Sequence, residues 1–374
     1  MMYTVYCGAI NNLNTKYPLH IEDPSGATVL INCNLHTVVN GAGDLSFTLL
    51  PNHPNYDRVK KRMYTFIDVM ENDKIVWRGR VTSINTDEYL QKTVTCEGCM
   101  SFLADTIQRP KKYTKELLSN FLADVIANHN AKEKHKAKKI TLGSVWKGST
   151  AKISGTVDYE TTLNAIDRLV VRKYGGIMDL VPSANGLELN YIKSFDAPAG
   201  QKIEFGENLV DFVIEQNSQD VYTAIIPLGA TPDTVHSGTI DGRITIKSVH
   251  PQGLDYLYKD NDGDTYINDY GWIFKVVENS DIDSPRELME WGKDVIDEMD
   301  WDAIVLQITA IDMAMLNPNL KSLHLGQKVN VISVPHNINK TLPVTEVNQN
   351  ISVPEPSRYT IGLKQKLKLS GLMR

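Results

Sequence analysis

The sequence predicts a β-rich α+β protein with several domains. At 374 residues the chain exceeds one ordinary hydrophobic core, so two to four domains are expected. Short runs of alternating apolar and polar residues occupy both ends, and segments with helical periodicity lie between them. We expect an all-β unit at 1–104, a mixed α+β domain at 105–202, a second β unit at 203–232 with 303–374, and an inserted α+β domain at 233–302.

The first β unit is organised around Asn40–Asp57. Gly41 and Gly43 give this stretch the backbone freedom of a bend, an alternating apolar strand follows, and Pro51 and Pro54 end it because proline cannot donate to a sheet ladder. The preceding run from Val29 can pair with it. Strands with β-rich composition are predicted on both sides: Val29–Leu35, Tyr64–Met70, Lys74–Ser83 and Gln91–Cys96. Such short, closely spaced strands are typical of a small barrel or sandwich.

The middle of the chain changes to helical periodicity. Apolar residues recur every three or four positions over Thr114–Asn130 and again over Tyr159–Tyr174, where Gly175 and Gly176 form the stop. Two strands, Gly176–Pro182 and Leu187–Ile192, then flank Asn185-Gly186, a strong hairpin signal. The spacing therefore predicts two helices followed by a hairpin.

Strands return beyond residue 203. A helix is also expected from Ser284, because this N-cap residue is followed by Pro285 and by Glu287 three positions on. Tyr256–Val277 is interpreted as a hairpin around 260–264. The remaining predicted strands are Leu209–Glu215, Tyr222–Leu228, Arg243–Val249, Ala303–Ile311, Lys328–Val334, Val344–Val347, Tyr359–Leu363 and an alternating Leu363–Leu369.

Overall charge and terminal composition exclude several function classes. The formal net charge of −6 argues against general nucleic-acid binding, which depends on neutralising phosphates. The sequence contains no apolar run of membrane-spanning length and no signal peptide at its start, so we expect no membrane partner and synthesis in a cytoplasm. The basic run Lys132–Lys139 lacks interleaved aromatics, and we interpret it as a solvated loop.

Two motifs resemble metal sites but are incomplete. Cys96 and Cys99 have the spacing of a zinc or redox pair, yet no second pair or nearby histidine completes a site. Asp260, Asp262 and Asp264 alternate as in a calcium loop, but the required glycine and the final glutamate are missing. A buried cysteine pair and a polar turn are the expected interpretations, and cation binding by the three aspartates stays open.

No catalytic signature stands out in the sequence. His129 and His135 form only a loose pair on the basic loop, and there is no HExxH, GxSxG or P-loop motif. We therefore nominate no catalytic, cofactor-binding or metal-binding residue, and no cofactor.

Six segments occur in order along the chain: NGAGDLSFTLLPNHPNYD at 40–57, IVWRGRVTSI at 75–84, CEGCMSFLAD at 96–105, IIPLGA at 225–230, YGWIFKVVE at 270–278 and LGQKVNVISVPHNI at 325–338. Together they resemble the hub region of the prophage tail endopeptidase family, the tail-tip proteins of long-tailed phages. The architecture implied is similar to the hub of contractile phage baseplates.

This resemblance implies a structural role in the virion. Each copy would contribute two tube-like β-barrels to a homotrimeric ring or cup, so that six barrels match the sixfold tail ring. The implied partners are the distal tail ring protein, the tape-measure protein and downstream tip or fibre proteins, at the distal tail tip. Family members named for peptidase activity carry it in further C-terminal sequence, so the enzymatic name is not carried over to these 374 residues.

Two other functions remain open at this stage. One is a cell-wall hydrolase of the tail-associated lysin kind. The other is a carbohydrate-binding module for host recognition, for which Trp146, Trp272 and Tyr256 are candidate surface aromatics, although aromatics of this kind more often pack in a core.

Overall fold

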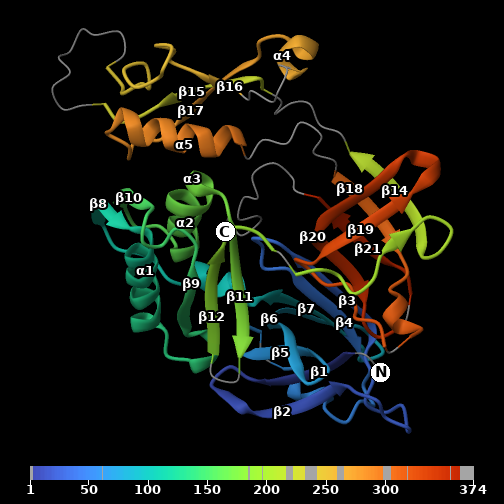
Figure 1. The fold of residues 1–374 in the computed structure, drawn as a ribbon. Coiled ribbons are helices and arrows are strands. Elements are labelled where there is room, and N and C mark those ends of the chain that lie inside the picture. The colour runs from blue at the N-terminus through green and yellow to red at the C-terminus, as the bar shows by residue number, and fades with distance from the viewer. Residues whose placement is uncertain are drawn as a thin grey trace.

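The computed structural model describes residues 3–60, 62–183, 186–195, 197–215, 222–231, 242–258, 265–297, 305–317, 319–353 and 355–362. Strands dominate, and a few helices lie between the two ends of the chain (Figure 1). The predicted β-rich α+β class is confirmed at this level.

The first β-unit comprises seven strands around one apolar core. Its strands are β1 (Tyr3–Ala9), β2 (Asn12–His20), β3 (Ile31–Val38), β4 (Asp44–Leu49), β5 (Thr65–Glu71), β6 (Lys74–Thr86) and β7 (Lys92–Gly98). The predicted pairing of β3 with β4 is confirmed, and β5 and β6 form an antiparallel hairpin. Asn72 and Asp73 have positive φ angles of 46° and 64° in that turn, which suits these residue types.

The second β-unit comprises the strands β13 (Ile203–Glu204), β14 (Leu209–Glu215), β18 (Val305–Ala310), β19 (Lys328–Ser333), β20 (Ile338–Asn350) and β21 (Ser357–Ile361). Its core is a separate apolar cluster that includes Ile203, Ile308, Val331 and Tyr359. The predicted strand at Leu363–Leu369 lies outside the described residues.

The two β-units share one strand order. In the first unit the ladder runs β3-β4-β7-β6-β5, and in the second it runs β14-β18-β21-β20-β19. With β3 and β14 counted as the first strands of their ladders, the first strand pairs with the second and the second with the fifth. The fifth then pairs with the fourth, and the fourth with the third. All these pairs are antiparallel. The units are therefore topological repeats.

The middle region, residues 105–195, packs two small sheets against helices. Its elements are β8 (Lys111–Leu117), α1 (Leu118–Lys132), β9 (Ile140–Val145), β10 (Lys152–Val157), α2 (Thr162–Ile166), a π-helical turn (Asp167–Val171), α3 (Arg172–Tyr174), β11 (Ile177–Ser183) and β12 (Gly186–Ile192). Antiparallel β11 and β12 confirm the hairpin, although Asn185 in its turn is outside the described residues.

The first predicted helix begins later than its apolar period indicates. Residues from Thr114 to Leu117 belong to β8, which pairs with β10 and buries Tyr113 against Phe121 at a ring-centroid distance of 4.9 Å. The expected start at Thr114 is therefore wrong, because tertiary pairing with β10 overrides the local helical pattern. Short three-ten helices complete the connections: Tyr56–Arg58, Cys99–Ala104, Lys136–Lys138, Met313–Met315 and Val334–His336.

The inserted region, residues 222–297 as described, has one sheet and one long helix. It contains β15 (Ala224–Leu228), β16 (Leu257–Tyr258), α4 (Thr265–Tyr270), β17 (Phe274–Glu278) and α5 (Pro285–Asp297). The predicted start of α5 is confirmed: Pro285 is its first residue, and the Leu288 N–H donates to the Ser284 carbonyl. Helix α5 lies between the sheet and the middle region (Figure 1), and Leu288 and Ile296 share a core with Ile225.

Three expectations for this region are wrong. β15 pairs with β16 and β17 and not with the second β-unit, where Tyr222–Leu228 was expected. β16 and β17 lie on opposite sides of β15, so Tyr256–Val277 is no hairpin. Arg243–Val249 is not a strand, because only Ile244 forms paired backbone hydrogen bonds there, with Gly229 and Ala230. Ile246 in this stretch is buried although it is not part of a strand. The domain boundaries as a whole stay a prediction.

Candidate functional site at the seam between the β-units

A backbone ladder between β3 and β20 joins the two β-units into one sheet. Residues Asn34 to Val38 face Asn350 to Glu346 in antiparallel register. Further backbone hydrogen bonds extend the contact at both ends, from the Val39 N–H to the Thr345 carbonyl at 3.0 Å and from Ile351 to Cys33 at 2.8 Å. Figure 1 shows β3 and β20 side by side in the middle of the molecule. We call this contact the seam.

His36 on β3 links carboxylates from both β-units. Its Nδ1 lies 2.9 Å from Asp44 Oδ2 and its Nε2 lies 2.9 Å from Glu346 Oε1. Both ring nitrogens therefore face acceptors, which suits the protonated imidazolium because it donates from both. The hydrogen bond to Asp44, with that to Glu346, raises the pKa of His36 above its ordinary value despite partial burial. The charged histidine thus ties β20 to β3.

A second polar contact crosses the seam at Glu71, the last residue of β5. The Ser322 hydroxyl donates to Glu71 Oε1 at 2.8 Å, and His324 Nε2 lies 2.9 Å from Oε2. Burial opposes charge on both partners. Even so, the hydrogen bond and charge of Glu71 raise the pKa of His324, and the contacts with His324 and Ser322 lower that of Glu71. The ionised pair is therefore the favoured state.

The first β-unit is also anchored to the middle region by a fully buried arginine. Arg78 on β6 forms a bidentate pair with Asp68, with Nε–Oδ1 and Nη2–Oδ2 distances of 2.7 and 2.9 Å. Its Nη1 donates to the Ser183 carbonyl at 2.9 Å, at the tip of the β11–β12 hairpin. Lys16 adds a second cation 2.7 Å from Asp68. Planar guanidinium geometry suits such a buried bidentate contact.

The basic run belongs partly to a similar network. Lys138 pairs with Asp105 at 2.9 Å and with Glu133 at 2.6 Å, and Arg80 binds the same Asp105 and also Glu97. Lys138 is mostly buried, with 12% of its side chain exposed. The interpretation of Lys132–Lys139 as a solvated loop is thus too simple, because Lys138 is mostly buried and shares Asp105 with Arg80 of the first β-unit.

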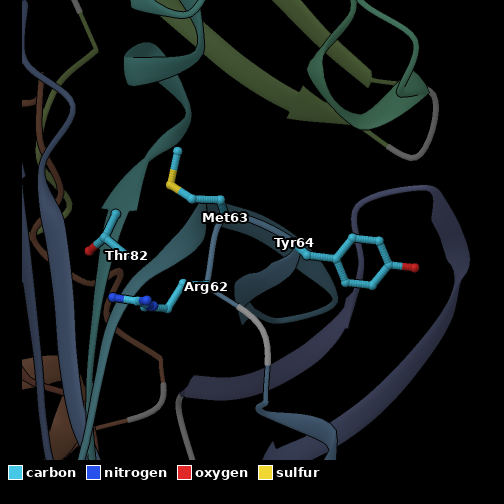
Figure 2. A pocket seen from close by; sticks show the side chains of 4 residues that line it. All are labelled: Arg62, Met63, Tyr64 and Thr82. Carbon is cyan, nitrogen blue, oxygen red and sulfur yellow. The ribbon is translucent and has the colours of Figure 1, made fainter.

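A surface depression of about 470 Å³ borders β6 on the first β-unit. It is lined by Arg62, Met63, Tyr64 and Thr82. Figure 2 shows that Tyr64 points away from Thr82, so the four side chains do not converge on a common point. Met63 is 42% exposed there. The site is open and carries no acid–base pair, which suits covering by another surface better than binding of a small molecule.

The cysteine pair is placed as expected. Cys96 and Cys99 are both buried and free, and burial raises the pKa of the Cys96 thiol well above its usual value and that of Cys99 to about 12. Protonated thiols are poor metal ligands.

His129 is fully buried and contacts Thr106 Oγ1 and the Lys138 carbonyl, so it is part of the core of the middle region. In the described part of the chain, no three His, Cys, Asp or Glu residues gather as a metal site, and Asp260, Asp262 and Asp264 lie outside it.

The candidate aromatics separate into two environments. Trp146 packs on the core of the middle region, 5.8 Å from the Tyr191 ring, whereas Trp272 is 49% exposed. Trp272 is stacked with Phe274, and the Tyr256 ring meets both edge-on. Trp272, Phe274 and Tyr256 lie on and beside the sheet of the inserted region.

Across the described residues, no helix has the length and apolar character needed to cross a membrane.

The seam residues carry no local sequence signal. His36 and Glu346 are 310 positions apart, and Glu71 and Ser322 are 251 apart. In the sequence, each of these four residues is an ordinary polar residue of a strand or loop, with no motif around it. Only the topological repeat, visible as matching strand spacing in the two β-units, could have indicated where the two ends of the chain meet.

Comparisons with known proteins agree with the fold. The family model described as prophage endopeptidase tail matches residues 197–369. A prophage tail protein from Listeria monocytogenes has a similar structure, with a TM-score of 0.64 and 12% identity over 97% of this chain and 95% of that chain. A tail protein from Neisseria meningitidis gives 0.62 and 12% over 98% of both chains. The prophage MuSo2 tail protein from Shewanella oneidensis gives 0.60 and 9% over 97% and 98%.

A search of curated protein sequences finds no match. The family model covers the second β-unit together with the inserted region, and the shared fold extends over the first β-unit and the middle region. Together these findings confirm the predicted resemblance to the hub region of the prophage tail endopeptidase family.

Proposed function

We propose that this protein is the structural hub of a phage tail tip. Three copies form a closed ring or cup in which the two β-units of each copy are tube-like barrels, giving six barrels around the tail axis. The ring closes the tail tube and connects the distal tail ring protein and the tape-measure protein to downstream tip or fibre proteins. Its action is mechanical: buried interfaces hold the ring, and its rearrangement opens the tube.

The observation that carries this proposal is the topological repeat within one chain. Two β-units with the same strand order are joined edge to edge at the seam, so one copy already contains two equal steps of a ring. A threefold assembly of such copies presents six equivalent β-units, which matches a sixfold tube above a threefold tip. No catalytic step is part of this proposal.

Size-exclusion chromatography with multi-angle light scattering tests the proposal directly. Over a range of concentrations, the expected mass is close to three times 41.9 kDa. Binding to the distal tail ring protein is the second expected result. A protein that remains monomeric at high micromolar concentration and does not bind the distal ring would contradict the hub.

A specific observation supports glycan binding as a second candidate function. Trp272 and Phe274 are about half exposed and stacked on each other, and exposed aromatic rings of this kind can stack on sugar rings. If this surface recognises host carbohydrate, Trp272→Ala abolishes retention on purified cell-wall glycan while the ring mass is unchanged. Equal retention of the variant and the parent protein would remove this function.

A further inference from the structure

Two buried histidines of the first β-unit contact the C-terminal end of β2. His20, the last residue of β2, is 2% exposed, and His53, in the segment after β4, is 4% exposed. The Leu30 N–H donates to His20 Nδ1 at 3.1 Å, and the Asn55 N–H donates to His53 Nδ1 at 3.0 Å. A ring nitrogen that accepts a backbone N–H carries no proton, so both imidazoles are neutral in this fold.

A β-bulge makes the end of β2 depend on side-chain contacts. The β1–β2 pairing contains a register shift, at which Leu19 of β2 has no partner residue on β1. His53 Nε2 donates to the Leu19 carbonyl at 3.0 Å, and Asn55 Nδ2 donates to the Pro18 carbonyl at 2.8 Å. Among the described residues, β1 is the one strand that pairs with β2. The segment at 53–55 therefore supplies polar contacts that a second strand would otherwise make.

No neighbouring group compensates a positive charge on either ring. In the part of the chain that the structure describes, His20 Nε2 has no acceptor within hydrogen-bond distance. Burial lowers the pKa of both histidines, and no charged side chain contributes to either shift. The titratable neighbours on β1 are Tyr3 and Cys7. Burial raises the pKa of Cys7 to about 12 and also raises that of Tyr3, so both stay neutral.

The charged residues of the surrounding segments are exposed or have other contacts. They are Lys16, Glu22, Asp23, Asp57, Arg58 and Lys92. Lys16 and Asp57 form ion pairs elsewhere, Asp23 accepts from backbone N–H groups of its own loop, and Glu22 is exposed. Arg58 lies 4.0 Å from the centre of the Tyr17 ring, and Lys92 donates to the Tyr56 carbonyl at 2.8 Å.

We propose that His20 and His53 form an acid-sensitive latch, which holds the end of β2 while both rings are neutral and releases it when they take up protons. A proton on Nδ1 turns each accepting nitrogen into a donor that faces a backbone N–H, so both contacts are lost. The latch goes beyond the proposed ring and does not rest on it, because all of its parts lie in the first β-unit of one copy.

The seam histidines respond to acid in the opposite direction. His36 and His324 face carboxylates, so a proton strengthens their contacts. For the latch, the folded pKa values are lowered, so its stabilisation is present above about 6.5 and is lost as pH falls below that value. Acid should therefore release the end of β2 while the seam stays closed.

The size of the effect follows from proton uptake. Each histidine that binds a proton only in the open state increases the opening equilibrium about tenfold per pH unit below about 6.5. Two such histidines give up to about a hundredfold per pH unit. Opening should be confined to residues 17–30 and 50–56, which contain both rings and their backbone partners.

Hydrogen exchange followed by mass spectrometry tests the latch in the full chain. Exchange is compared at about pH 7.5 and about pH 5.5, after correction for the intrinsic pH dependence of amide exchange. We expect opening of the 17–30 and 50–56 peptides to increase by about ten- to a hundredfold in acid. Peptides of the seam, at 34–38 and 346–350, should show no increase.

A double variant removes the two titrating groups. In His20→Asn combined with His53→Asn, the side-chain carbonyl oxygen can replace Nδ1 as the acceptor, so the increase in acid should disappear. The matched control is His250→Asn. His250 Nδ1 also accepts a backbone N–H, from Gln252 at 3.2 Å, but it lies in the inserted region. The control should keep the full acid response at 17–30.

The outcomes decide the latch without involving the hub. An increase in acid that the parent chain and the control share and the double variant lacks supports the latch. No increase in the parent chain, or an equal increase in the double variant, overturns it. If circular dichroism shows that the double variant does not fold, the single variants decide: each should lose about tenfold of the response per pH unit, and an undiminished response in both contradicts the latch. None of these results depends on the number of copies in the assembly.

Discussion

The middle region is attached to its two neighbours in different ways. On the first β-unit, Arg78 is fully buried, paired with Asp68 and hydrogen-bonded to the β11–β12 hairpin. On the inserted region, the contacts are Lys–Asp pairs: Lys147 with Asp294 and Lys115 with Asp283, both largely exposed, and a more buried pair between Lys173 and Asp281. Figure 1 shows these two neighbours below and above the middle region.

The difference indicates which boundary can move. A buried bidentate pair becomes costly once one partner is lost, whereas exposed ion pairs contribute about 0–1 kcal/mol each and weaken with salt. The first β-unit and the middle region should therefore behave as one rigid body, to which the seam adds the second β-unit. Two of the three ion pairs that hold the inserted region are exposed, and only Lys173–Asp281 is more buried, so we expect this region to change its orientation at a lower cost during assembly.

The largest effect is expected for Arg78→Ala. The change leaves Asp68 buried with only Lys16 as a partner and removes the hydrogen bond to Ser183, which should lower the free energy of unfolding by about 3–5 kcal/mol. Urea denaturation measures the loss, and hydrogen exchange should show the fastest new exchange in the β11–β12 hairpin.

The matched control is Arg172→Ala. Arg172 also pairs with an aspartate, Asp167, but its side chain is 59% exposed, so the expected loss is about 1 kcal/mol or less. Equal losses for the two arginines would show that burial does not distinguish this boundary.

The next largest effect is expected at Asn40, between β3 and β4. Its side chain donates to the Gly176 carbonyl at 3.0 Å and accepts from the Met178 N–H at 2.7 Å, so it ties the first β-unit to β11. Asn40→Gly should cost about 1–3 kcal/mol through the unpaired groups. Asn40→Ala should cost about 1–2 kcal/mol more, because φ is +54° there. Thermal unfolding of both variants would contradict this explanation if alanine were the milder change.

The sequence predicted elements better than contacts. Period-two alternation located β4 and β7, and the Ser284-Pro285 signal located the start of α5, because each signal is local. Helical periodicity gave the wrong conformation at Thr114–Leu117, where pairing with β10 decides the structure. At Tyr222–Leu228 the predicted strand is present, but its sheet partners come from later in the chain. Pairing partners depend on tertiary packing, which periodicity does not encode.

The candidate site was even less predictable. The seam joins residues separated by about three hundred positions, and Arg78 resembles any arginine in an alternating strand. The resemblance to tail proteins led to the expectation of two similar β-units, whereas the pairing of β3 with β20 required the structure. The expected burial of Cys96 and Cys99 is confirmed, because small apolar residues at the end of an alternating strand commonly lie in a core.

A smaller, pH-dependent effect should come from the seam. The folded pKa of His324 is raised by Glu71, so the stabilisation is fully present below the ordinary histidine pKa of about 6.5 and is lost as pH rises through the folded value. The pKa of Glu71 is lowered, so its contribution is lost only in acid, as pH falls through that lowered value. Unfolding free energy should therefore decline as pH rises above the ordinary histidine pKa of about 6.5, and His324→Gln should flatten this decline. An unchanged slope in the variant would exclude His324 as its source.

The smallest effect is expected for Lys147→Ala at the inserted region. Its pair with Asp294 is partly solvent-exposed, with 30% and 58% of the side chains accessible, so unfolding free energy should change by no more than about 1 kcal/mol. Hydrogen exchange should nevertheless increase at the contact between α5 and the middle region, since local opening requires less free energy than global unfolding. Raising the salt concentration should reproduce this exchange pattern in the unmodified protein, because screening acts on exposed pairs first. A loss as large as that of Arg78→Ala would mean that the inserted region is fixed as firmly as the first β-unit, and that both boundaries move together or not at all.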